Sequence, residues 1–194
     1  MAGRFEALPG GGAAVALDEV EISILRSLAV QLVELIGPGD EPVEGEDPLA
    51  ALFAEGPSEA PSDPALKRLF PDAYGDEDEE LRAAAADFRR YTENDLRARK
   101  RQDALAVIRS LDGLSATGDD EVVLKLTADE SRAWLGALND LRLTIGTRLE
   151  VTDEDESGEL YRLPDSDPRK PMVMAYLWLG ALQESLVETL MSGE

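Results

Sequence analysis

The most regular pattern of hydrophobic positions covers residues 133–151. Apolar side chains recur there at spacings of three and four, which is the period of one face of an α-helix. They are Trp134, Leu135, Leu138, Leu141, Ile145 and Leu149. Thr127 precedes this stretch with Glu130 three residues later, a spacing typical of a capping box at a helix start. The pattern predicts an amphipathic core helix that begins after Thr127, with polar residues interleaved among its apolar rows.

The same period predicts further helices. One begins after Asp18 and ends where Gly-Pro-Gly occupies residues 37–39. A last helix covers residues 171–191.

A long helix is predicted over residues 77–111. Its apolar stripe becomes polar near residues 92–95 and recovers afterwards, so we expect a kink or break there. The positions of the first part of this stripe are Leu81, Ala85 and Phe88.

Residues 37–80 differ from the rest in composition, with 14 acids, 2 bases and 7 prolines. Two apolar islands, residues 47–53 and 63–70, each begin with Asp-Pro, which suits an N-cap followed by proline at the first helical position. We expect two short helices here, inside an acidic loop of which about residues 37–63 are partly mobile.

Strand patterns are few. Residues 4–8 and 13–17 flank a Pro-Gly-Gly-Gly turn and predict a β-hairpin. Residues 121–126 (EVVLKL) read as a third strand, which we expect to join the hairpin because three strands are more stable than two. The predicted fold class is mainly α (α+β): a single domain over residues 1–194, with three to four long helices and a small antiparallel sheet.

Composition limits the chemistry. The chain has 41 acids against 19 bases, a net charge of −22, so its overall field repels nucleic acid and anionic membranes. It has neither cysteine nor histidine, which removes disulfides, thiolate nucleophiles, the usual zinc sites and imidazole bases. No phosphate-binding glycine loop or G-x-S-x-G motif is present. We expect a cytoplasmic, non-enzymatic protein with no cofactor and no membrane segment.

Two acidic runs could bind a divalent cation. They are residues 76–80 and 153–156. The second departs from EF-hand spacing, because Ser157 stands where a third acid is required. We expect a charged helix start and a solvated turn, without an ordered metal.

A basic run interrupts the acidic chain. Residues 82–109 hold 8 bases and 4 acids. The densest part contains four cations that could contact nucleic-acid phosphates: Arg97, Arg99, Lys100 and Arg101. The alternative, which we favour, is that they pair with the chain's own acids.

Polar residues also stand beside bulky apolar ones on two predicted helices. The set is Arg89, Arg90, Glu93, Asn139, Asp140, Arg142 and Arg148. They could form a polar pocket or partner site, or a structural ion-pair network that fixes helix register, which we favour. Apart from Arg148, we expect them to lie close together where the two helices cross.

The last helix is apolar on more than one side. Tyr176, Trp178 and Leu182 could form an interface for a homodimer or for another protein. The alternative, again favoured, is a central helix covered by its own domain.

Several motifs together carry a family resemblance. They are RLFPDAY (68–74), DFRRYTENDLR (87–97), WLGALNDLRLTIGTRL (134–149) and YLWLGALQESL (176–186). They resemble an actinobacterial family long listed as a domain of unknown function, encoded beside the gene for the proteolytic adaptor ClpS and including the oxidative-stress regulator AosR. The likeness covers nearly the whole chain except the acidic loop at residues 39–61.

The resemblance implies a transcription regulator that acts under redox stress with a sigma factor or RNA polymerase. It also implies an alternative role, as an accessory factor of ClpS/Clp-dependent proteolysis. The redox sensing attributed to AosR uses a cysteine pair, and this chain has no cysteine, so a thiol switch is excluded here. The resemblance supplies no catalytic residue.

Overall fold

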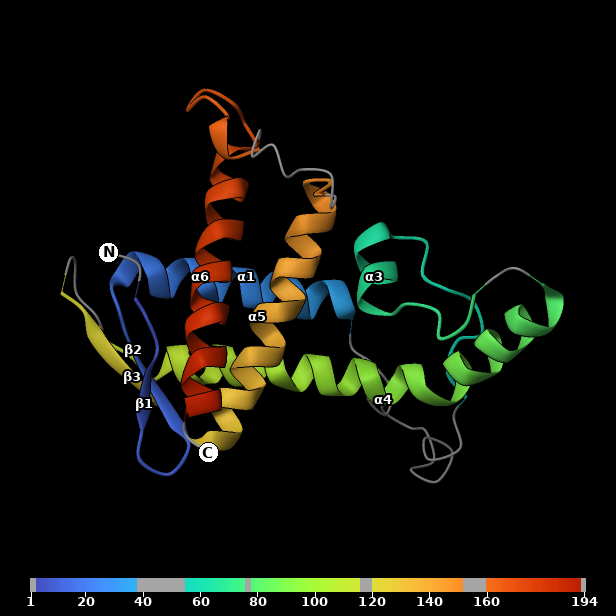
Figure 1. The fold of residues 1–194 in the computed structure, drawn as a ribbon, viewed down its shortest axis with the longest axis horizontal. Coiled ribbons are helices and arrows are strands. Elements are labelled where there is room, and N and C mark those ends of the chain that lie inside the picture. Colours follow the sequence, from blue (N-terminus) through green and yellow to red (C-terminus); the bar gives the residue numbers. More distant parts are fainter. Residues whose placement is uncertain (1–2, 38–54, 76–77, 116–119, 152–159, 193–194) are drawn as a thin grey trace, which may run out of the picture.

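The computed structural model describes residues 3–37, 55–75, 78–115, 120–151 and 160–192, without the side chain of residue 161. Helices dominate the described residues, and a small sheet lies at one end (Figure 1). The elements in chain order are β1 (Glu6–Leu8), β2 (Gly12–Leu17), α1 (Glu19–Ile36), α3 (Pro64–Leu69), α4 (Glu79–Asp112), β3 (Val122–Leu126), α5 (Ala128–Arg148), the 3-10 helix η2 (Leu160–Arg162) and α6 (Lys170–Ser192).

The sheet has the strand order β1-β2-β3 with both pairs antiparallel. Ala14 of β2 pairs with Glu6 of β1 on one side and with Lys125 of β3 on the other. The turn between β1 and β2 passes through Gly10 and Gly11 at φ of +88° and +80°, values that glycine adopts without a Cβ clash. The predicted hairpin, the addition of the third strand and the fold class are therefore confirmed.

The helix starts follow from local sequence. Asp18 and Glu21 form a reciprocal capping box at α1, and Thr127 and Glu130 form another at α5. Asp63 caps α3 by accepting hydrogen bonds from the amides of Ala65 and Leu66. The predicted short helix at 47–53 and the acidic turn at 153–156 lie outside the described residues.

Helix α5 is at the centre of the core. It packs against α3, α4 and α6, and Figure 1 shows it running alongside α6 while both cross α1 and α4. Trp134 of α5 is fully buried, meets the ring of Phe5 edge-on, and donates from Nε1 to Ser110 Oγ of α4 at 3.0 Å. The indole of α5 therefore contacts both α4 and the residue just before β1.

Helix α4 continues without a break through residues 92–95, so the expected break is absent. Its N-terminal end nevertheless turns away from the axis of the rest (Figure 1). Thr92 Oγ1 donates to the carbonyl of Phe88 at 2.7 Å, a back-bond of the kind that often bends helices.

The start of the chain is attached to the last helix. The amide of Phe5 donates to Ser185 Oγ, and Thr189 Oγ1 donates to the carbonyl of Phe5, both at 3.2 Å. Arg4 pairs with Glu188 one turn along the same helix.

No helix among the described residues is both long enough and apolar enough to cross a membrane.

Candidate interaction site on helix α4

Four charged residues recur every fourth position along one face of α4. They are Arg89, Glu93, Arg97 and Arg101. At this spacing, side chains stack one turn above another. The face is turned toward α3 and the end of α1, so its charges are directed inward.

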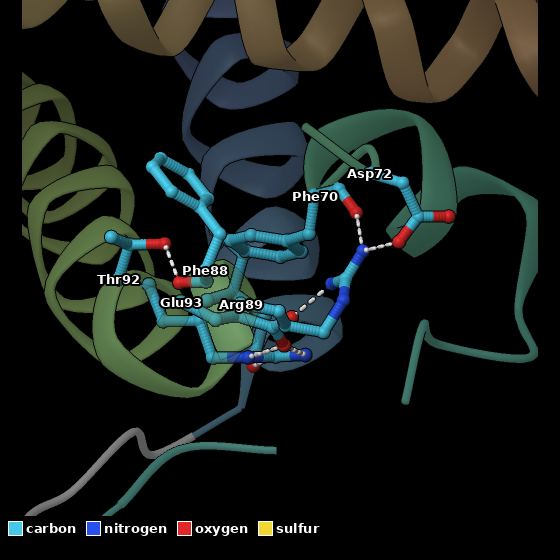
Figure 2. A network of polar contacts seen from close by, with 8 residues as sticks. Phe70, Asp72, Phe88, Arg89, Thr92 and Glu93 are labelled. Carbon is cyan, nitrogen blue, oxygen red and sulfur yellow. Dashed lines mark hydrogen bonds and ion pairs between the residues drawn. The ribbon is translucent and has the colours of Figure 1, made fainter. Parts of the chain in front are cut away.

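Arg89 is 5% exposed and bridges α4 to the segment after α3. Its Nη2 donates to the carbonyl of Phe70 at 2.9 Å and to Asp72 Oδ1 at 2.8 Å, while Nη1 pairs with Glu93 (Figure 2). Burial disfavours the guanidinium charge, but hydrogen bonds and charges from Asp72 and Glu93 outweigh it and raise the pKa of Arg89. The cation is therefore held permanently.

Glu93 is shared between two arginines. Its second oxygen, Oε1, accepts from Arg97 Nε at 2.9 Å and lies 2.8 Å from Arg97 Nη2 in the same ion pair. The Arg97 guanidinium in turn lies 4.4 Å from the centre of the Phe70 ring, a cation–π distance. A carboxylate that is 3% exposed thus has two cations as neighbours, which the burial of a charge requires.

The same face completes the end of α1. The last carbonyls of a helix have no partner within it, and α1 has no basic residue in its last turn. Arg97 Nη1 donates to the carbonyl of Ile36 at 2.7 Å, and Arg101 Nη1 donates to that of Gly37 at 3.3 Å. The network therefore joins α1, α3 and α4.

Exposed apolar side chains lie on α4 beside this junction. Tyr91 is 68% exposed and Phe88 is 49% exposed, and the Phe88 ring meets that of Tyr74 edge-on with centres 6.2 Å apart. Leu96 extends the patch and shares with Phe88 a shallow hollow of about 50 Å³. We call Tyr74, Phe88, Tyr91 and Leu96 the aromatic surface. Exposed apolar patches of this kind mark partner sites.

Acids adjoin the aromatic surface. Asp72 and Asp87 are exposed next to it, and Asp95 lies one turn beyond Tyr91. A partner with basic residues around an apolar centre would be complementary to this arrangement.

The expected cluster of residues from α4 and α5 does not form as predicted. Asp140, which is 2% exposed, pairs with Lys100 at 2.6 Å, not with Arg89 or Arg90. Lys100 lies about two turns along α4 from Glu93, because the crossing of the helices brings α5 to that level. Arg90 instead makes exposed pairs with Glu55 and Asp87.

Burial is the largest influence on the pKa values of the two acids at this crossing, Asp140 and Asp103. It raises the pKa of Asp140, against the hydrogen bond and charge of Lys100 and a hydrogen bond from Asn139. Burial also raises the pKa of Asp103, against the charge of Arg99. Gly136 allows this approach, since a Cβ there would lie 2.6 Å from Asp103 Oδ2.

The four cations considered for nucleic acid are used mainly inside the fold. Arg97, Lys100 and Arg101 have the partners described above. Arg99 is exposed, and its charge partly offsets the rise that burial causes in the pKa of Asp103. The arrangement agrees with internal pairing as the main use of these charges.

The other polar residues predicted on α5, Asn139, Arg142 and Arg148, have partners of their own. Arg142 donates to Gln183 Oε1 at 2.7 Å and lies over the ring of Tyr176, and Gln183 donates to Asn139 Oδ1 at 3.4 Å. Arg148 makes a partly exposed pair with Asp63 at 2.9 Å.

The prediction that Leu182 belongs to an interface is wrong. It is completely buried, because it belongs to the face of α6 that packs on the domain's own core. Trp178 is partly buried against that core, which places it at the edge.

Sequence reasoning missed two features of the site. Phe88 was assigned to the buried stripe of α4, but the buried face here is formed by Ala85, Arg89 and Glu93, and Phe88 is exposed beside it. Asp72 and the carbonyl of Phe70 had no sequence signal as partners, apart from their place in the RLFPDAY motif. Among the described residues, no group of acids is arranged to hold a metal ion.

Comparison with known proteins identifies relatives. The family model of a domain of unknown function, DUF2017, matches residues 2–190. Proteins named "Oxidative stress regulator AosR" from Mycobacterium bovis and Mycobacterium tuberculosis are 30% identical over 176 residues, covering 88% of this chain and 78% of theirs. No solved structure matches the chain. The match to the family model over nearly the whole length shows that the chain belongs to the DUF2017 family.

Proposed function

We propose that this protein is a non-enzymatic regulator of the oxidative-stress response, and that it binds a sigma factor or RNA polymerase through the aromatic surface. The mycobacterial relatives are named as oxidative stress regulators, and the similarity to them extends over 88% of this chain. A shared role is supported by that extent.

The aromatic surface is the observation that carries the proposal. Tyrosine and phenylalanine supply large contact area at a low cost in conformational entropy. The buried charges of Arg89, Glu93 and Arg97 fix α4 beneath them. A surface held in its bound shape loses less entropy on association.

Charge supports a partner from the transcription machinery. Proteins that bind DNA neutralise phosphates with lysine and arginine, so they carry basic surfaces. A chain of net charge −22 is attracted to such surfaces, and the acids beside the aromatic surface add a local contribution.

The alternatives have less support. Direct DNA binding through residues 82–109 would need cations that instead pair with Glu93 and Asp140. A role with ClpS/Clp rests on the family's gene neighbourhood alone.

Purified partners from the organism that encodes the chain test the proposal. Its sigma factors, RNA polymerase core enzyme and ClpS are each titrated against the wild type and Tyr91→Ala. Loss of a central interface tyrosine should weaken sigma-factor or polymerase binding by about tenfold or more. Val123→Ala, which alters another exposed apolar residue, on β3, is the control and should bind normally. Equal affinity of both variants would reject the aromatic surface, and binding of ClpS alone would favour the alternative.

A further inference from the structure

Arg142 has no acidic partner among the described residues, in a chain with 41 acids. Its Nη1 donates to the side-chain oxygen of Gln183, and its guanidinium lies 5.2 Å from the centre of the Tyr176 ring. Both contacts orient the cation, but neither neutralises it. An arginine that is drawn into a fold normally gains a carboxylate.

The guanidinium presents only one usable edge. Its Nε is buried without a partner, whereas Nη2 is not among the buried unsatisfied atoms. Nη1 gives one of its two hydrogens to Gln183, and Nη2 gives none to any described residue. Both hydrogens of Nη2 and one hydrogen of Nη1 are therefore left for a ligand.

Neighbouring residues hold this end of the guanidinium in place. Gln183 also donates to Asn139 Oδ1, which anchors the amide that orients Arg142. Gly146 of α5 leaves room for the Tyr176 ring, because a Cβ there would lie 3.3 Å from the Tyr176 Cε2 atom. The donor pair is thus preorganised by α5 and α6 together.

Arg142 lines an open hollow of about 680 Å³ along α6. Leu177, Ala181 and Val187 supply an apolar wall. Glu184 and Glu188 also line it, and Glu188 is paired with Arg4. The hollow therefore combines one oriented cation, an apolar wall and one acid without a described ion-pair partner.

We infer that this hollow is a binding site for a small organic monocarboxylate with an apolar body. Two parallel N–H groups of a guanidinium match the two oxygens of a carboxylate. A phosphate would bring a second negative charge toward Glu184 and Glu188 with a single arginine to offset it. The apolar wall would cover the hydrocarbon part of the acid. Nothing in this site depends on the aromatic surface of α4.

Hexanoate is a suitable probe for NMR titration of the full chain. We expect saturable shifts of the Gly180 amide and the Gln183 side-chain amide, with hexanol and inorganic phosphate giving none. Arg142→Gln should weaken hexanoate binding by about tenfold or more. Arg142→Lys, which keeps the charge without the planar fork, should weaken it less than Arg142→Gln does. Arg148→Gln is the matched control on the same helix, outside the hollow, and should bind as the wild type does.

Glu184 provides a second test. Glu184→Gln removes the nearby negative charge, so hexanoate should bind several-fold more tightly. Far-UV circular dichroism and melting curves check that each variant is folded. Linear, non-saturating shifts, equal binding by wild type and Arg142→Gln, or equal binding of hexanol would each overturn the assignment. Binding of a dipeptide with a free C-terminal carboxylate, but not of hexanoate, would overturn it in favour of a protein tail.

Discussion

Two arginines in this fold have similar surroundings but differ in the charge of the side chain that accepts their hydrogen bond. Arg97 at the α3–α4 junction lies over the ring of Phe70 and donates to the carboxylate of Glu93. Arg142 at the α5–α6 junction lies over the ring of Tyr176 and donates to the amide of Gln183. Glu93 is an acid, whereas Gln183 is its neutral isostere. This difference decides whether the arginine is neutralised within the fold. The first arrangement stabilises structure, and the second leaves charge for a ligand.

Changing the acid to the amide at the first junction should have the largest effect. In Glu93→Gln, Arg89 and Arg97 both lose a buried counter-charge, and such losses cost about 3–5 kcal/mol. Urea unfolding followed by circular dichroism measures the free energy of unfolding. Glu80→Gln, at an exposed position in the first turn of α4, should leave it nearly unchanged. Equal stability of both variants would show that the junction does not depend on this charge.

The lysine pair at the helix crossing should rank next. Asp140→Ala leaves the partly exposed Lys100 without its acid, and we expect a loss of about 1–3 kcal/mol. The loss is smaller than at Glu93 because Lys100 retains some contact with water. Thermal unfolding would measure it, and a change below that of Arg148→Ala at the exposed pair would contradict it.

Asp140 should also make stability depend on pH in a defined direction. Burial raises the native pKa of its carboxyl above the ordinary value of 3.8, so the folded state holds this proton more tightly than the unfolded chain. Its contribution is therefore complete below pH 3.8 and declines as the pH rises through the native pKa. The stability of the wild type relative to Asp140→Asn should fall over that range. A carbon-detected NMR titration of Asp140 with a midpoint below 3.8 would reverse the sign.

Variants of the exposed Arg148–Asp63 pair separate the stability contributed by helix capping from that contributed by the ion pair. Asp63→Ala removes the N-cap of α3 as well as the pair and should cost about 1 kcal/mol. Arg148→Ala removes the pair alone and should cost less, since exposed pairs contribute about 0–1 kcal/mol. Melting temperatures of the two variants test the order, and equal losses would assign the effect to the pair.

Giving Arg142 the acid that Arg97 has should produce the smallest change in stability. Gln183→Glu creates a partly exposed pair, which we expect to stabilise the fold by less than about 1 kcal/mol. It should also abolish hexanoate binding, because the new carboxylate takes the place of the ligand. Retained binding in this folded variant would mean that the two junctions differ by more than one atom type.

The local features of this fold were readable from sequence, and the pairings between helices were not. The capping box at Thr127 depends on Glu130 three positions away, so its spacing predicted the start of α5. A helix start after Asp18 was also predicted, and the structure adds a capping box there with Glu21. The partner of Asp140 is 40 residues away in sequence and is set by the crossing of two helices, which no periodic pattern specifies. The polar interruption of α4 near Glu93 suggested a break, but it marks the place where the helix buries charges.

Within the site, residue type predicted involvement better than role. Several polar residues between apolar ones form ion pairs, among them Arg89 with Glu93 and Asp140 with Lys100, whereas Arg142 has no acidic partner among the described residues. Their division into separate junctions depended on α3 and the end of α1, whose carbonyls carry no sequence signature as acceptors. Phe88 was misplaced because two of the three buried positions near it, Arg89 and Glu93, are charged, so the apolar stripe alone did not identify the buried face.

The hydrogen bonds between Phe5 and helix α6 bear on when the protein can fold during its synthesis. Phe5 is synthesised about 180 residues before Ser185 and Thr189. Phe5 and Trp134 cannot be enclosed until α6 has left the ribosome, because that helix supplies Leu179, Leu182 and Leu186 to the same core. Contacts so distant in sequence close slowly. The nascent chain should therefore remain incompletely folded, and dependent on its acidic charge for solubility, until translation has passed this helix.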